Sequence, residues 1–177
     1  MNRRGDGGAH GTAAKIRKTA KIDVERIAEI EKVTKHDVIA FLESLMDRVG
    51  PEHRFLHMGL TSSDIVDTSL AIQMTEALDL ILEGVEKFLV VLKKQAFRYK
   101  NQVMVGRSHG IHGEPISFGL KMALWYEEVR RHRDRLRQVR NEIAVGKLSG
   151  AMGTFAHQGP DIEEYVCAKL GLKADPV

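Results

Sequence analysis

One long apolar repeat constrains the fold of this chain more than any other feature of its sequence. Apolar residues recur at alternating steps of three and four, which is typical of a helix packed in a bundle or coiled coil. A helix from about residue 61 to residue 100 would be on the order of 55 Å long. Further apolar residues lie off this seam, so we expect more than one neighbouring helix. The seam consists of Leu70, Met74, Leu78, Ile81, Val85, Phe88, Leu92 and Ala96.

A shorter and broken helix is predicted before the long one. Asp23 can cap its start, because a carboxylate accepts a hydrogen bond from the free N–H groups of a first turn. An apolar stripe then runs to the Gly50-Pro51 pair, which ends the helix, and polar residues near 34–37 interrupt it. Residues 1–12 hold four glycines and no apolar period. We interpret them as a flexible lead or as a remnant of cloning or truncation.

Two glycine-rich breaks divide the rest of the chain. The first covers residues 106–113 and is followed by Pro115, which is tolerated at the first position of a helix, so a third long helix is predicted there. The second break covers residues 146–153 and precedes a short helix from about Pro160 to Leu170. No strand is predicted, and the expected fold class is therefore all-α.

Much of the positive charge of the chain lies in one arginine-rich segment, and the net charge is +3. Acidic residues are interspersed at helical spacing, so we interpret the segment as a solvated helix face with i,i+4 pairs. No aromatic platform accompanies it, so no nucleic-acid partner is expected, and RNA binding is a minor alternative. The arginines are Arg130, Arg131, Arg133, Arg135, Arg137 and Arg140.

Cysteine usage and hydropathy predict a cytoplasmic protein. The lone Cys167 cannot form an intrachain disulfide, which fits a reducing compartment, and its apolar context indicates a packing residue. The most apolar stretch, residues 78–92, contains four charged residues, so it is too polar to span a bilayer. The first 12 residues lack the apolar core of a secretory signal, and no membrane partner is expected.

Three short polar segments carry the residue types that catalysis and binding require. Each combines histidine with hydroxyl or carboxylate groups, and glycines in two of them leave backbone N–H groups open to stabilise negative charge. A small acidic or phosphorylated substrate is the natural ligand. From spacing alone, a shared active site and unrelated loops are equally supported. The segments are Thr34–Asp37, His57–Asp64 and Gly106–Pro115.

Other kinds of site are disfavoured by the same segments. His109 and His112 are three residues apart, but no third ligand lies nearby and the context is a glycine-rich loop, so no metal site is expected. Neither glycine-rich break follows a predicted strand, which argues against the phosphate-binding loops of ATP and NAD sites.

Four segments, in order along the chain, resemble the adenylosuccinate lyases of the fumarase/aspartase superfamily. The resemblance covers about Lys15 to the end of the chain, and it implies a bundle of long helices that is incomplete here. Residues 13–60 would belong to an N-terminal helical domain, and residues 61–177 would form the first part of the central bundle domain. The four segments are residues 30–41, 57–68, 106–121 and 146–156.

The resemblance also implies an activity. Enzymes of this family cleave adenylosuccinate to AMP and fumarate, and they cleave the succinyl-carboxamide imidazole ribotide of purine synthesis in the same way, without a cofactor. They are homotetramers in which each active site is assembled from three subunits. By this likeness the chain would bind a nucleotide substrate and assemble with copies of itself.

The likeness assigns roles to individual residues. His109 would be the general acid that protonates the leaving nitrogen, and an imidazole suits this role because it exchanges protons near neutral pH. The substrate-binding residues would be Lys35, His36 and Asp37 at the nucleotide end and Thr61 and Ser62 at the succinyl carboxylate, with His57 beside them and Ser108 next to the acid.

The chain departs from the family pattern in several places. Lys35 stands where arginine is usual, which replaces a bidentate fork by a point charge. Ser108 replaces threonine and Gly113 replaces alanine. A mobile serine-rich loop that supplies the general base is missing, as is an Arg-Tyr pair near the N-terminus. We therefore expect a truncated lyase that is inactive, or nearly so, by itself.

Two other interpretations stay open. One is a different lyase of the same superfamily with another succinyl or carboxy substrate, and Lys35 is the residue that supports it. The other is a non-catalytic helical module that associates with complete subunits.

Overall fold

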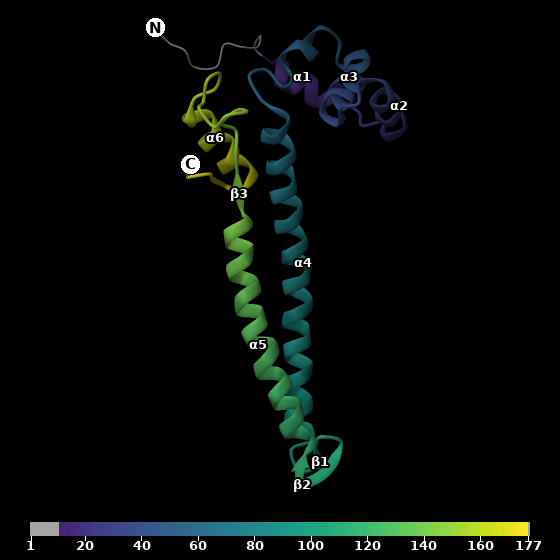
Figure 1. The fold of residues 1–177 in the computed structure, drawn as a ribbon, viewed down its shortest axis with the longest axis vertical. Helices are drawn as coiled ribbons and strands as arrows, with labels where there is room; N and C mark the ends of the chain where they lie inside the picture. The colour runs from purple at the N-terminus through teal and green to yellow at the C-terminus, as the bar shows by residue number, and fades with distance from the viewer. Residues whose placement is uncertain (1–10, 177) are drawn as a thin grey trace. The chain divides into compact units, whose positions relative to one another are not determined.

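The computed structural model describes residues 11–176, which divide into two compact units (Figure 1). The first unit holds residues 11–66 and 148–163, and the second holds residues 67–147 and 164–176. The chain passes from one unit to the other within a long helix. Residues 1–10 of the predicted lead lie outside the described residues.

Short helices form the first part of the first unit. Asp23 caps one of them by accepting a hydrogen bond of 3.1 Å from the backbone N–H of Arg26, which confirms the predicted start. The predicted interruption near residues 34–37 is also confirmed, whereas the first helix of the chain was not predicted. The elements are α1 (Thr12–Thr19), α2 (Val24–Thr34), α3 (Asp37–Val49) and the 3-10 helix η1 (Gly50–Phe55).

Helix α3 supplies the apolar core of this unit. Its apolar residues recur at helical spacing and face one side, so they can be buried together. It ends at Val49, where Gly50 has a φ of 74°, and Pro51 then lies in the first turn of η1. The Gly-Pro pair therefore ends the helix as predicted. The buried residues of α3 include Val38, Ala40, Leu45 and Val49.

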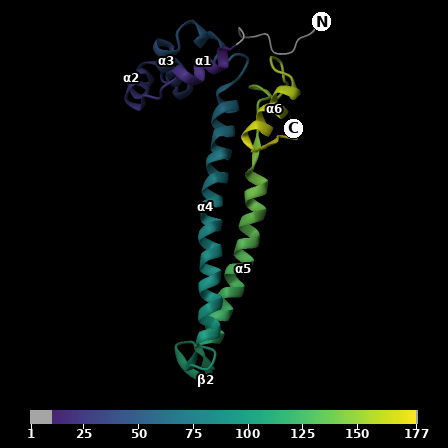
Figure 2. The same ribbon diagram turned by 180° about the vertical axis from the view of Figure 1, so that it is seen from behind.

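Two long helices dominate the second unit. Helix α4 spans Ser62–Arg98 and enters this unit at Asp67, and helix α5 spans Phe118–Ile143. The two lie side by side in Figures 1 and 2. The bounds of α4 confirm the long helix that the apolar seam predicts. The predicted short helix is also present as α6 (Pro160–Leu170), and it ends before Gly171, whose φ is 73°.

A β-hairpin joins α4 to α5, where a loop followed directly by a helix was predicted. Strands β1 (Val103–Ser108) and β2 (Ile111–Ser117) pair in antiparallel fashion. Pro115 lies inside β2, and α5 begins only after Ser117, whose hydroxyl accepts the N–H of Leu120 at 3.1 Å. The predictions of no strand and of a helix opening at Pro115 are therefore wrong. β-Branched residues on both sides of a two-residue turn favour the hairpin.

The base of the hairpin packs closely on the end of α4. The N–H of Phe118 donates to the carbonyl of Gln102 at 2.8 Å, and the N–H of Gly119 donates to the carbonyl of Tyr99 at 2.9 Å. The rings of Tyr99 and Phe118 meet edge to face, with centroids 5.3 Å apart. A Cβ on Gly119 would collide with the carbonyl oxygen of Ala96, so only glycine allows this approach.

Two very short strands, which were not predicted, tie the end of the chain to the end of α5. Strands β3 (Val145–Gly146) and β4 (Lys173–Ala174) pair in parallel. From α4, the hydroxyl of Thr68 donates to the carbonyl of Lys147 and accepts its N–H, both at 3.0 Å. Cys167 is fully buried and lies next to Gly146 of β3, which agrees with its interpretation as a packing residue.

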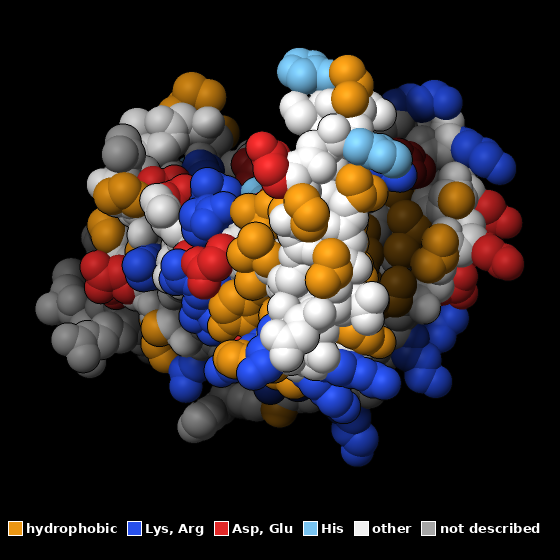
Figure 3. Space-filling model, turned by 90° about the horizontal axis from the view of Figure 1, so that it is seen from below, with side chains coloured by type: hydrophobic (Ala, Val, Ile, Leu, Met, Phe, Trp, Pro, Cys, Tyr) orange, Lys and Arg blue, Asp and Glu red, His pale blue; other side chains and the backbone are white. Residues whose placement is uncertain are grey.

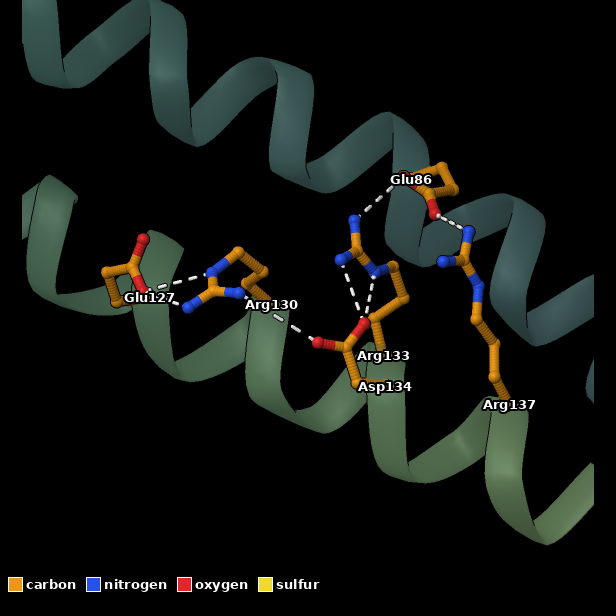
Figure 4. Close-up of polar contacts among 6 residues, drawn as sticks. All are labelled: Glu86, Glu127, Arg130, Arg133, Asp134 and Arg137. Atoms are coloured by element: carbon orange, nitrogen blue, oxygen red, sulfur yellow. Dashed lines mark hydrogen bonds and ion pairs between the residues drawn. The ribbon is translucent and has the colours of Figure 1, made fainter.

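The arginine-rich face of α5 pairs with acidic residues on its own helix and on α4 (Figure 4). Within α5, Arg130 lies 3.9 Å from a carboxylate oxygen of Asp134, four positions later, which confirms the predicted i,i+4 pairing, and 2.8 Å from Glu127, three positions earlier. Across the two helices, Glu86 lies 2.7 Å from Arg137 and 3.8 Å from Arg133. The face therefore also joins α5 to α4.

Many large apolar side chains of α4 and α5 stay exposed in the described chain. This observation agrees with the expectation that these helices need further neighbours. Among the helices of residues 11–176, every one is too short or too polar to pass through a lipid bilayer. The most exposed apolar residues on the two helices are Leu80, Val90, Phe97, Leu120 and Leu124.

Candidate active site

The break between α2 and α3 presents three of the predicted substrate-binding residues. Lys35 has a φ of 54°, a left-handed conformation that is uncommon outside glycine, and its N–H closes α2 on the carbonyl of Glu31. His36 follows as the N-cap of α3, and Asp37 is the first residue of that helix. All three side chains are exposed. The turn therefore leaves an ammonium, an imidazole and a carboxylate open to a ligand.

His36 contacts Ser62, although 26 positions separate them. Its Nε2 lies 3.3 Å from the Oγ of Ser62, and its Nδ1 accepts the backbone N–H of Ile39 at 3.4 Å. An Nδ1 that accepts leaves the ring proton on Nε2, so the imidazole donates to Ser62. A doubly protonated ring, with Nδ1 turned to the Asp37 carboxylate at 3.3 Å, also donates from Nε2. In a neutral ring with its proton on Nδ1, facing Asp37, Nε2 would instead accept the hydroxyl proton of Ser62, so the direction of this contact follows from the tautomer.

Asp64 holds the first turn of α4. It lies in one of the predicted polar segments but was not among the predicted substrate-binding residues. Its carboxylate is 1% exposed. One oxygen accepts the N–H of Thr61 at 2.9 Å, and the other accepts the N–H of Gly150 at 3.2 Å. The spacing of Thr61 and Asp64 matches a capping box, which was a readable signal. Gly150 lies in the predicted glycine-rich break, but nothing in the sequence indicated its bond to Asp64.

His57 lies in a tight turn just before α4. It has a φ of 59°, and its carbonyl accepts the N–H of Leu60 at 3.2 Å. The amide of Gln158 donates to the carbonyl of Met58 at 2.9 Å. Gly59 has a φ of 75°, and a Cβ there would lie 2.6 Å from the amide nitrogen of Gln158. The turn that carries His57 is therefore held by a segment about 100 positions later.

The loop that contacts Asp64 is fixed by a second buried carboxylate. Glu163 is 3% exposed, and it accepts the N–H of Leu148 at 2.6 Å. Between these two anchored residues, Ser149 is 2% exposed, and its hydroxyl has no hydrogen-bond partner within the described part of the chain. The sequence predicted a break here and a resemblance over residues 146–156, but it did not reveal the two contacts that anchor the loop, because each depends on a single acidic residue in a distant segment.

Ser108 and His109 lie at the tip of the hairpin, and both are exposed. His109 and Gly110 have φ values of 52° and 74°, and two positive values in a two-residue loop are the signature of a type I′ turn. Figure 3 views this end of the second unit, and pale-blue histidine side chains project from the hairpin there. The turn geometry therefore sets the direction in which His109 leaves the backbone.

The structure brings some of the predicted site residues together. His36 and Ser62 are in contact within the first unit, and Thr61 adjoins Ser62. Ser108 and His109 belong to the second unit and follow the far end of α4. This helix has 37 residues and is on the order of 55 Å long.

The sequence profile of a family described as lyase matches residues 7–176. The chain belongs to this lyase family. The chain is similar to the adenylosuccinate lyase of Staphylococcus saprophyticus, with 52% identity over 163 residues, and to that of Synechocystis sp., with 53% identity over 160 residues. These matches cover 92% and 90% of this chain. They cover only 38% and 37% of the two relatives, so the chain spans little more than a third of their length.

The fold of the chain is similar to that of solved structures. The fumarate lyase of Mesorhizobium sp. BNC1 superposes with a TM-score of 0.87 at 27% sequence identity, over 96% of this chain and 42% of that one. The all-α class with long bundled helices is confirmed, with the hairpin and the short strands as local additions. The three polar segments that resemble the family are therefore parts of a known lyase fold.

Proposed function

We propose that this chain is part of an adenylosuccinate lyase. The whole enzyme would cleave adenylosuccinate to AMP and fumarate, and the succinyl-carboxamide imidazole ribotide to its carboxamide product and fumarate, in purine biosynthesis. Two relatives of that name, from Staphylococcus saprophyticus and Synechocystis sp., share about half of the residues of this chain, and this observation carries the proposal. We also propose a cytoplasmic enzyme without a cofactor, in which residues 13–60 belong to an N-terminal domain and residues 61–177 begin the central bundle.

The exposed groups of the first unit suit an anionic ligand. Lys35, His36 and Asp37 would contact the nucleotide end, because an ammonium and an imidazole N–H attract phosphate. Thr61 and Ser62 would donate to the succinyl carboxylate, with His57 beside them. The contact of 3.3 Å between Ser62 and His36 supports this role, because it places the hydroxyl beside a group proposed to bind the same substrate. Donors aimed at this carboxylate stabilise the charge that develops there as the β-proton leaves.

His109 would act as the general acid. As the C–N bond breaks, its electron pair passes to the nitrogen, which takes a proton from the imidazole and leaves as AMP. The β-proton of the succinyl group goes to a separate base, and the carbon pair left behind forms the double bond of fumarate. Ser108, next to His109 at the hairpin tip, would contact the same substrate region.

A homotetramer with shared sites follows from the same proposal. The likeness implies that each active site is assembled from several copies, so Ser62 and His109 of different copies would contribute to one site. Exposed apolar residues on α4 and α5 would be covered in such an assembly. Light scattering coupled to size exclusion would then report a mass above that of one chain, and a strict monomer would contradict this part.

A chimeric enzyme tests the activity. Residues 7–176 would replace the matching segment of the Staphylococcus saprophyticus relative, and fumarate release from adenylosuccinate would be followed. We expect turnover, and we expect His109→Ala to lower kcat by about 10²- to 10⁴-fold, the usual contribution of a general acid. His132→Ala is the matched control, because His132 is exposed on α5 outside the polar segments. A folded chimera that cleaves another succinyl substrate but not adenylosuccinate would favour a different lyase.

A further inference from the structure

Asp64 is a buried carboxylate that bonds two segments distant in sequence. It is 1% exposed, and its two oxygens accept hydrogen bonds from different places. Oδ2 accepts from Thr61, at the start of α4, and Oδ1 accepts from Gly150, 86 positions later. A buried carboxylate that lost either partner would leave a backbone N–H unsatisfied as well, so both bonds constrain the structure.

Helix capping explains only half of this arrangement. A side chain at this position of a first turn normally returns to the N–H of the capping residue, which the bond to Thr61 does. The helix dipole also favours a negative group there. Neither effect requires the bond to Gly150. That second bond instead joins the start of α4 to the loop whose other end Glu163 fixes at Leu148.

The two residues proposed to bind the succinyl carboxylate through their hydroxyl groups lie next to these two hydrogen bonds of Asp64. Thr61 and Ser62 precede Asp64 by three and two positions, and the Oγ of Ser62 lies 3.3 Å from Nε2 of His36. A shift of the α4 start would therefore change the contact between Ser62 and His36. Hydrogen bonds that fix a binding group commonly decide whether it meets its ligand in a productive geometry.

We propose that Asp64 is a positioning residue, which sets the Ser62–His36 contact through its simultaneous bonds to Thr61 and Gly150. It does not touch the substrate. This inference rests on the proposed function for its catalytic consequence, although the coupling itself is a property of the chain alone. Loop 148–150 then contributes to substrate binding indirectly, by locking the hydroxyls in place.

Nuclear magnetic resonance of the full 177-residue chain tests the coupling directly. Asp64→Asn keeps the size of the side chain and one acceptor oxygen, but its NH2 group would face one of the two N–H donors. We expect amide exchange at Gly150 at least about tenfold faster, and a shift of the ¹⁵N signal of the His36 ring. Ser63→Ala is the matched control, because Ser63 is exposed on the same turn. It should leave both signals unchanged.

Two results would overturn the inference. One is a His36 signal in Asp64→Asn that matches the control, because Asp64 would then be a helix cap only. The other is unchanged exchange at Gly150. If Asp64→Asn does not fold, Asp64→Glu provides the same readouts, since it keeps the charge and the capping bond but misplaces the oxygen that reaches Gly150.

The chimeric enzyme separates this inference from the proposed function. In a chimera that cleaves adenylosuccinate, Asp64→Asn should raise KM or lower kcat at least about tenfold, while Ser63→Ala should not. Equal kinetics for the two variants would contradict a positioning role. A chimera without any adenylosuccinate cleavage would refute the proposed function. The coupling would still be decided separately, by amide exchange at Gly150 and by the ¹⁵N signal of the His36 ring in the chain alone.

Discussion

The start of α4 and the tip of the hairpin both carry proposed substrate contacts, but different interactions hold them. At the start of α4, the buried carboxylate of Asp64 accepts hydrogen bonds from Thr61 and from Gly150, which is far away in sequence. At the hairpin tip, Ser108 and His109 are exposed, and the backbone shape follows from a two-residue turn between paired strands. The start of α4 is therefore held by tertiary hydrogen bonds, whereas the conformation of the hairpin tip is set by the residues of its own turn.

This difference predicts where each segment is vulnerable. The start of α4 should respond to substitutions in the loop that contacts it, even when they lie about 90 or 100 positions away. The structure of the hairpin tip should be changed only by substitutions in its own two-residue turn, provided that the base of the hairpin stays packed on α4. Substitutions at the base, at the loop anchor, at the tip and on an exposed ion pair test this expectation in order of decreasing effect.

Gly119→Ala should have the largest effect, because it removes the support on which the hairpin depends. The added Cβ would collide with the carbonyl of Ala96 and lie 2.6 Å from the backbone of Lys100, and neither can move without disturbing the end of α4. We expect a loss of about 3 kcal/mol in the free energy of unfolding, measured with urea. Gly84→Ala is the matched control, since nothing lies near its Cβ inside α4, and it should stabilise the chain by about 1 kcal/mol. Equal effects of the two would contradict the close packing.

Glu163→Ala should have the next largest effect, on the loop that anchors the start of α4. The substitution leaves the buried N–H of Leu148 without its acceptor, which costs about 2 kcal/mol. Glu164→Ala changes the exposed neighbour and should have almost no effect on the urea midpoint. If both variants unfold at the midpoint of the unsubstituted chain, the carboxylate of Glu163 does not hold the loop.

The long helices and their caps could be predicted because their signals are local. The apolar seam predicted α4, Asp23 predicted the start of α2, and Gly50 with Pro51 predicted the end of α3. The hairpin also has a local signal, the β-branched residues around His109-Gly110. Pro115, however, favours the start of a helix, which is why a helix was predicted there. Proline is also compatible with an edge strand, and that alternative applies here.

The tertiary part of the candidate site could not be predicted from spacing. The bonds of Asp64 to Gly150 and of Gln158 to Met58 join residues about 90 to 100 positions apart, and no periodicity links them. The resemblance to a lyase family pointed to the right segments. It did not reveal which single side chains hold those segments together, because that depends on how the loop returns to the first unit.

Gly110→Ala tests the local character of the hairpin tip. Nothing lies within 4 Å of a Cβ at this position, so the cost comes only from the φ of 74°, and about 1 kcal/mol is expected. Gly113→Ala is the matched control, because its Cβ would make an ordinary contact of 3.7 Å and its φ is not positive. Amide exchange should become faster in the hairpin for Gly110→Ala alone. Faster exchange at Thr61 as well would show that the tip is not independent.

The exposed ion pair between Asp79 on α4 and Arg140 on α5 should have the smallest effect, and its contribution should depend on pH. The guanidinium of Arg140 donates hydrogen bonds of 2.9 and 2.8 Å to Asp79 and holds the pKa of that carboxyl below its ordinary value of 3.8. The unfolded chain regains the ordinary pKa, so it binds a proton at a higher pH than the folded chain does. The pair therefore adds stability above that pKa, and the contribution is lost as the pH falls through the lower folded value.

Asp79→Asn should remove this part of the acid sensitivity, which urea midpoints between about pH 6 and pH 2 would report. Arg140→Gln should produce the same loss, and the double variant should lose no more than either single one, because both remove one interaction. High salt should reduce the effect in the unsubstituted chain, since the partners are exposed to solvent. Additive losses in the double variant would mean that the two side chains act separately, so that the Asp79–Arg140 pair would not join α4 to α5.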